Sequence, residues 1–357
     1  MTESVGVMDR PLRVLVVDDS VFNRRSISEI LGQTAEVEVI GKAADGEEAL
    51  RLVSVLKPDA ITLDLEMPRM DGFTFLRILM VRSPKPVIVV SSHTQKENVF
   101  RALELGALDF VAKPERWDEG ELGGMRRELV EKVLQVRGLR VSTVGVRPRA
   151  EALAQPQPVR PEASVGQPKH VVAMGSSTGG PSALMEIFAR LPVRLKGVIL
   201  IAQHMPDKFT RTFAERLDRR GGVRVVEAQG WELVEPSTAY VCPGRRCMEL
   251  EAMPDGGLRV RVSSPEPTDR YIPSADRLFL SVAKAVGARA VGVILTGMGD
   301  DGTAGARAIL EAGGTVVAES ERTAVINGMP GSAVRAGAVT RTLLLQEMAD
   351  FIAGLGS

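Results

Sequence analysis

LRVLVVDD, at residues 12–19, joins a run of apolar residues to two adjacent carboxylates. Short apolar runs bounded by polar residues are typical of buried parallel strands, so Asp18 and Asp19 should stand at the carboxyl edge of a sheet. Two later apolar runs also end at a charged residue, one at the acidic Asp64 and the other at the basic Lys113. Ligands bind at this edge in doubly wound folds. The stretch therefore predicts an α/β unit with three carboxylates and one ammonium around one pocket.

Apolar runs and segments of helical periodicity alternate from Pro11 to about Leu134. We expect strands at 12–17, 37–42, 60–63, 86–91 and 108–112, and helices at 20–31, 46–55, 96–105 and 119–134. Strands that alternate with helices favour a parallel sheet covered on both faces. The first part of the chain is thus predicted to be a five-stranded α/β domain.

The clustered acidic residues predict a phosphoryl-transfer site. Three carboxylates packed together repel one another unless a hard divalent cation such as Mg²⁺ lies among them. We expect Asp18, Asp19 and Asp64 to hold Mg²⁺ and Asp64 to accept a phosphoryl group. Lys113 and the Ser91 hydroxyl would then contact the phosphate oxygens. Taken singly, each aspartate could instead be a helix N-cap.

The sequence pattern of the second half of the chain also predicts an α/β domain. We expect strands at 170–174, 197–201, 290–295 and 315–318, and a helix at 181–190. The glycine-rich turn GSSTGG at 175–180 fits the G-x-S-x-G spacing, in which a sharp turn exposes a serine hydroxyl at the sheet edge. A doubly wound C-terminal domain follows from this pattern.

Serine, histidine and aspartate follow three of these strands, as Ser177, His204 and Asp301. A serine is a weak nucleophile unless a base removes its proton, and the base needs a carboxylate that fixes its tautomer. The three residues therefore predict acyl transfer. Their order along the chain differs from the serine, acid, histidine order of α/β-hydrolases, so we expect a different fold with convergent chemistry.

A binding module without catalysis is the alternative. GMGDDG at 297–302 matches the dinucleotide fingerprint G-x-G-x-x-G, with Glu319 at a ribose-binding distance. Two adjacent carboxylates inside that loop would repel a pyrophosphate, which counts against it. The glycine turn at 175–180 could also bind an anion through its free amides.

Composition excludes several classes of protein. The 357 residues contain 45 Lys plus Arg and 45 Asp plus Glu, so the overall charge balance does not indicate nucleic-acid binding. Two cysteines are too few for a disulfide framework, and no apolar stretch reaches about 18 residues. We expect a cytoplasmic protein without membrane insertion. A proline-rich stretch at 135–168 has few large apolar residues and is expected to be a linker.

The N-terminal part resembles the receiver domains of response regulators. The resemblance rests on VVDDS at 16–20, LDLEMPRMDG at 63–72, Ser91 and Lys113-Pro114. It implies that a histidine kinase phosphorylates Asp64, and that Phe110 is the counterpart of the family's rotating aromatic residue.

The C-terminal part resembles the chemotaxis protein-glutamate methylesterases, the CheB family. The motifs are GSSTGG at 175–180, QHMP at 203–206, PSADRLF at 273–279 and LTGMGDDG at 295–302. The order of receiver, linker and esterase matches as well, with expected domains at 11–134, 135–168 and 169–357.

This second resemblance implies roles for individual residues. Ser177 would be the nucleophile, His204 the general base and acid, and Asp301 the orienting carboxylate. The Met298 amide would contribute to the oxyanion hole, and Thr178 would line the same pocket. The chain departs from the family at Ile272, often a basic residue, and at Asp300, often a neutral one.

The implied activity is removal of methyl groups from glutamate γ-methyl esters on chemoreceptor helices, with possible deamidation of glutamine. We expect phosphorylation of Asp64 to activate the esterase, and no cofactor in the esterase domain.

Overall fold

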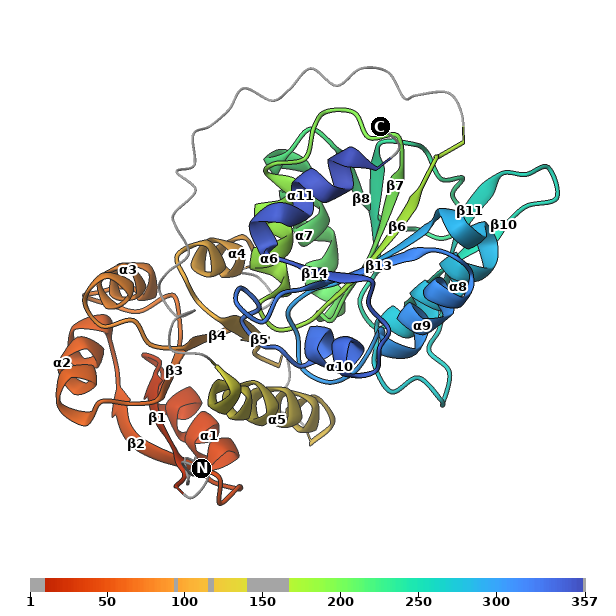
Figure 1. The fold of residues 1–357 in the computed structure, drawn as a ribbon. Helices are drawn as coiled ribbons and strands as arrows, with labels where there is room; N and C mark the ends of the chain where they lie inside the picture. Colours follow the sequence, from red (N-terminus) through yellow and green to blue (C-terminus); the bar gives the residue numbers. More distant parts are fainter. Residues whose placement is uncertain (1–9, 93–95, 115–118, 140–166, 356–357) are drawn as a thin grey trace, which may run out of the picture. The chain divides into compact units, whose positions relative to one another are not determined.

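The computed structural model describes residues 10–92, 96–114, 119–139 and 167–355 (Figure 1). Most of the predicted linker at 135–168 lies outside these residues. The chain divides into two compact units, and each is described by itself below. The expected domain boundaries stay predictions.

The first unit contains a parallel sheet in the order β2-β1-β3-β4-β5. Its strands are β1 (Leu12–Val17), β2 (Val37–Ala43), β3 (Ala60–Leu63), β4 (Val87–Ser91) and β5 (Asp109–Ala112). Its helices are α1 (Val21–Leu31), α2 (Gly46–Leu56), α3 (Gly72–Arg82), α4 (Lys96–Glu104) and α5 (Glu119–Leu134). The prediction of a five-stranded parallel domain is confirmed, although it contained no helix at the position of α3.

Helix starts in this unit follow from side-chain capping. Ser20, Asp45 and Asp71 each accept a hydrogen bond from a backbone N–H in the first turn of α1, α2 and α3. Such caps satisfy amides that have no partner within the helix. The helices α1 and α5 contact each other, as do α2 and α3, so both faces of the sheet are covered.

Residues at the two ends of the expected linker contact the units that flank it. Val136 is 8% exposed and belongs to the core of the first unit, just after α5. Gln167 donates a hydrogen bond to the Gly256 carbonyl, and the Pro168 carbonyl accepts one from Arg289.

The second unit contains a seven-stranded sheet in the order β14-β13-β12-β6-β7-β9-β8, with all neighbours parallel. Its strands are β6 (Val171–Ser176), β7 (Val198–Gln203), β8 (Arg224–Glu227), β9 (Thr238–Val241), β12 (Ala290–Ile294), β13 (Thr315–Glu319) and β14 (Arg341–Leu343). A separate antiparallel hairpin is formed by β10 (Cys247–Ala252) and β11 (Leu258–Ser263).

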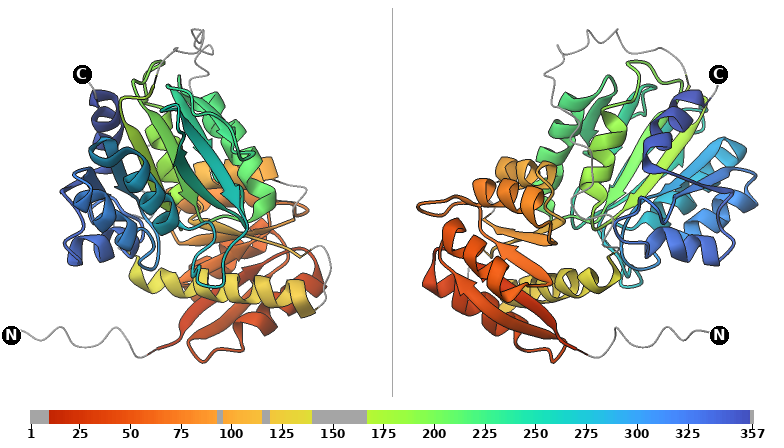
Figure 2. Two further views of the ribbon diagram at one scale, coloured as in Figure 1. Left: turned by 90° about the vertical axis from the view of Figure 1, so that its right-hand side faces the viewer. Right: turned by 60° about the vertical axis from the view of Figure 1, so that its left-hand side comes forward.

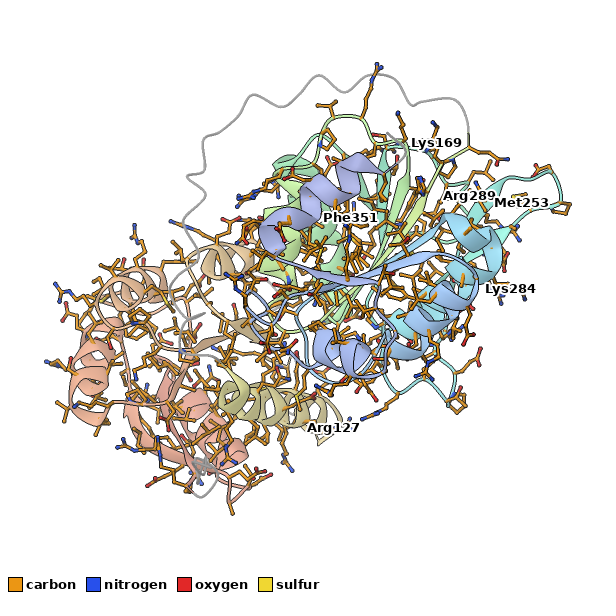
Figure 3. All side chains as sticks on the ribbon, in the orientation of Figure 1. Arg127, Lys169, Met253, Lys284, Arg289 and Phe351 are labelled. Atoms are coloured by element: carbon orange, nitrogen blue, oxygen red, sulfur yellow. The ribbon has the colours of Figure 1, made fainter. Side chains whose placement is uncertain are left out.

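Helices cover both faces of this sheet (Figure 2). They are α6 (Gly180–Phe188), α7 (Asp207–Arg220), α8 (Ala275–Val286), α9 (Thr303–Glu311), α10 (Met329–Arg335) and α11 (Leu345–Gly354). One layer holds α6, α7 and α11, and the other holds α8, α9 and α10, with the hairpin packed on α8. Phe351, labelled on α11 in Figure 3, has the Arg341 guanidinium of β14 4.9 Å from its ring centroid. The doubly wound fold class is confirmed.

The strand order reverses direction between β6 and β12. From β6 the chain moves outward through β7 to β9 and β8, and it later returns to pair β12 against the other side of β6. Such a topological switch point leaves a crevice at the carboxyl ends of the strands. Among the described residues, no helix is long and apolar enough to cross a membrane.

Candidate functional site

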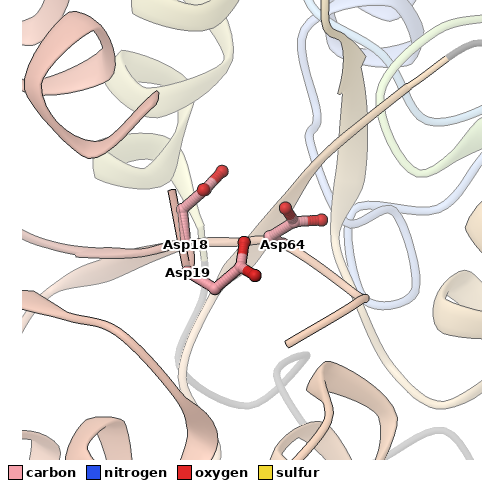
Figure 4. A group of neighbouring side chains, drawn as sticks. All are labelled: Asp18, Asp19 and Asp64. Atoms are coloured by element: carbon pink, nitrogen blue, oxygen red, sulfur yellow. The ribbon is translucent and has the colours of Figure 1, made fainter. Parts of the chain in front are cut away.

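The acidic cluster of the first unit forms where β1 and β3 end. The carboxylates of Asp18, Asp19 and Asp64 offer oxygen atoms that all lie within 4.8 Å of one another (Figure 4). Asp18 and Asp64 are buried, whereas Asp19 is exposed. An all-oxygen donor set with one open side fits Mg²⁺, which prefers oxygen ligands and keeps part of its water shell.

Lys113 joins this cluster from the end of β5. Its ammonium lies 2.5 Å from Asp64 Oδ2 and 2.8 Å from Asp18 Oδ2. Burial raises the pKa of Asp64 above its ordinary value. Burial alone would lower the pKa of Lys113, but the Asp64 and Asp18 carboxylates raise it, so this residue stays a cation.

Ser91 and Phe110 lie on the neighbouring strands. Ser91 is the last residue of β4 and is fully buried, and Phe110 is 1% exposed on β5. The Phe110 ring packs edge-on against Phe100, with centroids 6.3 Å apart. The Lys132 ammonium lies 5.1 Å from the centroid of the Phe110 ring and donates a hydrogen bond to the backbone carbonyl of Phe110 at 2.5 Å. The aromatic side chain is therefore held inside the core in this state.

Ser177 of the second unit lies on a sharp turn directly after β6. Its amide donates to the Thr296 carbonyl at 3.0 Å, which ties the turn to the end of β12. Gly179 has φ +77°, a left-handed conformation that favours glycine, and it is the N-cap of α6. A Cβ atom on Gly297 would lie 2.7 Å from Ser177 Cβ, so only glycine fits beside the serine.

His204 and Asp301 are hydrogen-bonded to each other. His204 Nε2 lies 2.8 Å from Asp301 Oδ2, and the Asp301 side chain is 1% exposed. The carboxylate also accepts from the amides of Ala275, Asp276 and Gly302 at 2.7, 2.9 and 3.0 Å. The first two of these amides begin α8, and a helix N-terminus favours a negative charge. This arrangement fixes the acid and leaves Nδ1 of the imidazole for another partner.

The structure places Ser177 at the adjacent strand end but records no hydrogen bond between it and His204 in the described parts of the chain. The two residues are connected through the backbone, because the His204 amide donates to the Ser176 carbonyl at 3.0 Å. Hydrogen bonds of catalytic groups are often long before substrate binds.

Met298 and Thr178 lie on the loops around Ser177. The Met298 amide donates no hydrogen bond to a described protein group, and its side chain is 43% exposed. Thr178 is 2% exposed, and its carbonyl accepts from the Thr296 hydroxyl at 2.9 Å. A free amide beside a serine is a candidate donor to an oxyanion.

Tyr271 is a residue of this site that sequence reasoning missed. Its ring stacks on the His204 imidazole. Its hydroxyl donates to Asp300 Oδ1 at 2.9 Å, and Arg270 pairs with the same carboxylate at 3.1 Å. Asp300, noted as a departure from the family pattern, is therefore a partner of Tyr271. The departures at Asp300 and at Ile272, which follows Tyr271 in the chain, were the signals in the sequence, because Tyr271 lies on a loop without periodicity.

The dinucleotide interpretation of 297–302 is not favoured. Glu319 is 1% exposed, and its Oε2 accepts from the Thr296 amide at 2.9 Å. The side chain therefore stabilises the loop from inside instead of facing a ribose. Asp301 is likewise committed to His204.

Comparison with known proteins agrees with both units. A family model described as CheB methylesterase matches residues 172–352, and one described as response regulator receiver domain matches residues 14–122. A Myxococcus xanthus protein named protein-glutamate methylesterase/protein-glutamine glutaminase 1 is 47% identical over 346 residues, covering 96% of this chain and 97% of that one. An Anaeromyxobacter dehalogenans protein named protein-glutamate methylesterase/protein-glutamine glutaminase 6 is 48% identical over 342 residues. The match covers 95% of this chain and 94% of that one. The solved Thermotoga maritima CheB methylesterase catalytic domain superposes with a TM-score of 0.51 at 34% identity, covering 54% of this chain and 100% of that one.

Proposed function

This chain belongs to the CheB methylesterase family and carries a receiver domain, and from that membership we propose how its residues perform and regulate the reaction. The enzyme hydrolyses glutamate γ-methyl esters on the cytoplasmic helices of chemoreceptors and releases methanol. It also deamidates receptor glutamines, because an amide carbonyl at the same position is open to the same attack. We expect it in the cytoplasm, where its kinase and the receptor helices meet.

Ser177 attacks the ester carbonyl in the first step. His204 takes the serine proton through Nδ1 and returns it to the departing methoxide, which leaves as methanol. Water then attacks the acyl-enzyme with His204 as the base, the bond between the acyl group and Ser177 Oγ breaks, and His204 returns the proton to Ser177 as the glutamate product leaves. The hydrogen bond of 2.8 Å between His204 Nε2 and Asp301 Oδ2 is the observation that carries this proposal, because it fixes the tautomer that the base requires.

The charge that develops on the carbonyl oxygen needs hydrogen-bond donors. The Met298 amide is the proposed donor, since it has no described protein partner, and Thr178 lines the same pocket. One such donor is worth roughly 10²- to 10³-fold in rate in a comparable oxyanion hole.

Control of the reaction lies in the first unit. A histidine kinase supplies the phosphoryl group to Asp64. Asp18, Asp19 and Asp64 would hold Mg²⁺, which would supply positive charge opposite the phosphoryl oxygens. Lys113 adds a second positive charge, and Ser91 offers a hydroxyl to a phosphate oxygen. Phosphorylation then releases Phe110 and Ser91 from their present packing and raises esterase activity.

Methanol release from methylated receptor tests the proposal. We expect turnover by the wild type, faster turnover with a small-molecule phosphodonor, and none by Ser177→Ala with folding retained. If Ser177→Ala turned over as fast as the wild type, the C-terminal unit would be a binding module instead. Equal rates with and without the phosphodonor would overturn the regulatory part alone.

A further inference from the structure

Gln203 lies between the two turns that carry the candidate nucleophile and base. It is the last residue of β7, it is 1% exposed, and it precedes His204. Its Nε2 donates to the Ser177 carbonyl at 3.0 Å and to the His204 carbonyl at 2.8 Å. One carboxamide is thus hydrogen-bonded to the main chain of both residues.

The orientation of this carboxamide is fixed from its other end. Ser176 and Gln203 are the last register partners of β6 and β7. The Ser176 hydroxyl donates to Gln203 Oε1 at 2.6 Å, and Ser176 is fully buried. Because a hydroxyl can donate to the oxygen of the amide, while both carbonyls require its nitrogen, the reversed orientation would leave two carbonyls facing an oxygen. Both N–H groups of Gln203 are therefore committed.

Close packing leaves no room for a different arrangement. A Cβ atom on Gly180 would overlap Gln203 Oε1, so the first residue of α6 is kept small by the carboxamide. The Ser177 carbonyl accepts from both the Gly180 amide, at 2.8 Å, and Gln203 Nε2. The carbonyl of the candidate nucleophile is therefore held by two donors.

We propose that Gln203 is a positioning residue that sets the relative placement of Ser177 and His204, and that it touches no substrate. This inference rests on the proposed function. No direct hydrogen bond joins the two side chains in the described structure, so their relative position depends on the main chain at residues 177 and 204. A misplacement of about 1 Å can cost roughly 10²-fold in rate.

Gln203→Met provides the first test, because methionine has nearly the same length but no donor. We expect kcat on methylated receptor to fall by roughly 10²-fold with KM changed less than threefold. The matched control is Val198→Ala, a fully buried position at the opposite end of the same strand, which lowers stability without touching the turns. Both variants are compared by unfolding and by kcat. An equal loss of kcat in the two variants, or a Gln203→Met enzyme within twofold of the wild type, would overturn the inference.

Gln203→Glu gives a readout that a purely structural role would not move. A buried carboxyl group has a raised pKa and donates one hydrogen bond only when protonated. In this variant an oxygen replaces Nε2 and faces the Ser177 and His204 carbonyls. As pH rises, that oxygen loses its proton and its charge repels both carbonyls, so we expect the ratio of the variant's kcat to that of the wild type to fall. A constant ratio across the pH range in which both proteins stay folded contradicts the proposal.

Ser176→Ala separates the two ends of the carboxamide, since it removes the partner of Oε1 and leaves both donors. We expect kcat within about fivefold of the wild type, well above Gln203→Met. A loss as large as that of Gln203→Met would contradict the assignment of the effect to the two N–H groups. Failure of the proposed esterase function can be told apart from failure of the positioning role of Gln203, because in the first case the wild type itself would release no methanol.

Discussion

Tyr271 lies flat against His204, with ring centroids 5.3 Å apart and planes inclined by 7°. Burial and the neighbouring Asp300 carboxylate raise the pKa of Tyr271, so its hydroxyl stays protonated and donates to Asp300. The Arg270 guanidinium lies 5.1 Å from the same ring. One face of the imidazole is therefore covered by a side chain that is itself anchored.

Tyr271→Ala should slow the enzyme by removing this contact. With one face uncovered, the imidazole of His204 gains rotational freedom, and we expect kcat to fall by roughly tenfold. Tyr271→Phe keeps the stacked ring and should stay within about threefold of the wild type. Methanol release at saturating methylated receptor checks both. A Phe variant as slow as the Ala variant would mean that the hydroxyl, not the ring, matters.

Asp301→Asn should cost both activity and stability. The asparagine cannot fix the required tautomer of His204, and we expect kcat to fall by roughly 10³- to 10⁴-fold. Its NH₂ group would face backbone N–H donors, which costs about 1–3 kcal/mol of unfolding free energy. Chemical denaturation and methanol release measure the two effects. The adjacent Asp300→Asn is the control, and because that side chain is 55% exposed we expect less than threefold loss there.

Phosphoryl incorporation should require Asp64 and a divalent cation. We expect no incorporation from a small phosphodonor in Asp64→Asn, or in the wild type after chelation of Mg²⁺, with recovery when Mg²⁺ is restored. Phosphate-affinity electrophoresis measures the product. Asp59→Asn, at the opposite end of β3, serves as control and should be labelled normally. Incorporation into Asp64→Asn would place the phosphoryl group on another residue.

The two cysteines of the chain should be unreactive in the native protein. Burial raises the pKa of Cys247 to about 11 and raises that of Cys242 well above its usual range. At pH 8 roughly one Cys247 side chain in a thousand is then a thiolate, the reactive form. We expect slow thiol labelling at pH 8, a rate that rises with pH toward 11, and two rapid equivalents in denaturant. Rapid stoichiometric labelling of the folded enzyme at pH 8 would contradict this picture.

Sequence reasoning located the buried parallel strands because they have a simple apolar signature, but it ended β6 and β7 two residues before their observed ends at Ser176 and Gln203. It found β1 and β3 at their observed bounds, and the residues that follow them. It contained no helix at α3, whose buried Gly72, Phe73, Phe75, Leu76 and Leu79 give little amphipathic contrast. In the second unit, no expectation covered the hairpin of β10 and β11, the strands β8, β9 and β14, or the helices α7 to α11.

The contacts within the site were harder to predict than its residues. The sequence predicted that Ser177, His204 and Asp301 would converge, because each follows a strand and parallel strands end at one edge of a sheet. Tyr271 and Gln203 were assigned no role. Gln203 stands in the motif at 203–206, but a stacked ring on a loop and a carboxamide that bonds two carbonyls depend on three-dimensional placement, which spacing does not specify.

The Asp301 carboxylate is oriented largely by main-chain amides, and this has a consequence for how substitutions around it act. An amide N–H is present whatever the side chain, so the two hydrogen bonds from the start of α8, at residues 275 and 276, depend on the path of the backbone. Only proline lacks that hydrogen. The third donor, Gly302, has φ +89°, a left-handed conformation that favours glycine. The geometry of the Asp301 carboxylate thus depends mainly on the path of the backbone, so we expect substitutions that move the start of α8 to disturb it more than exchanges of nearby side chains do.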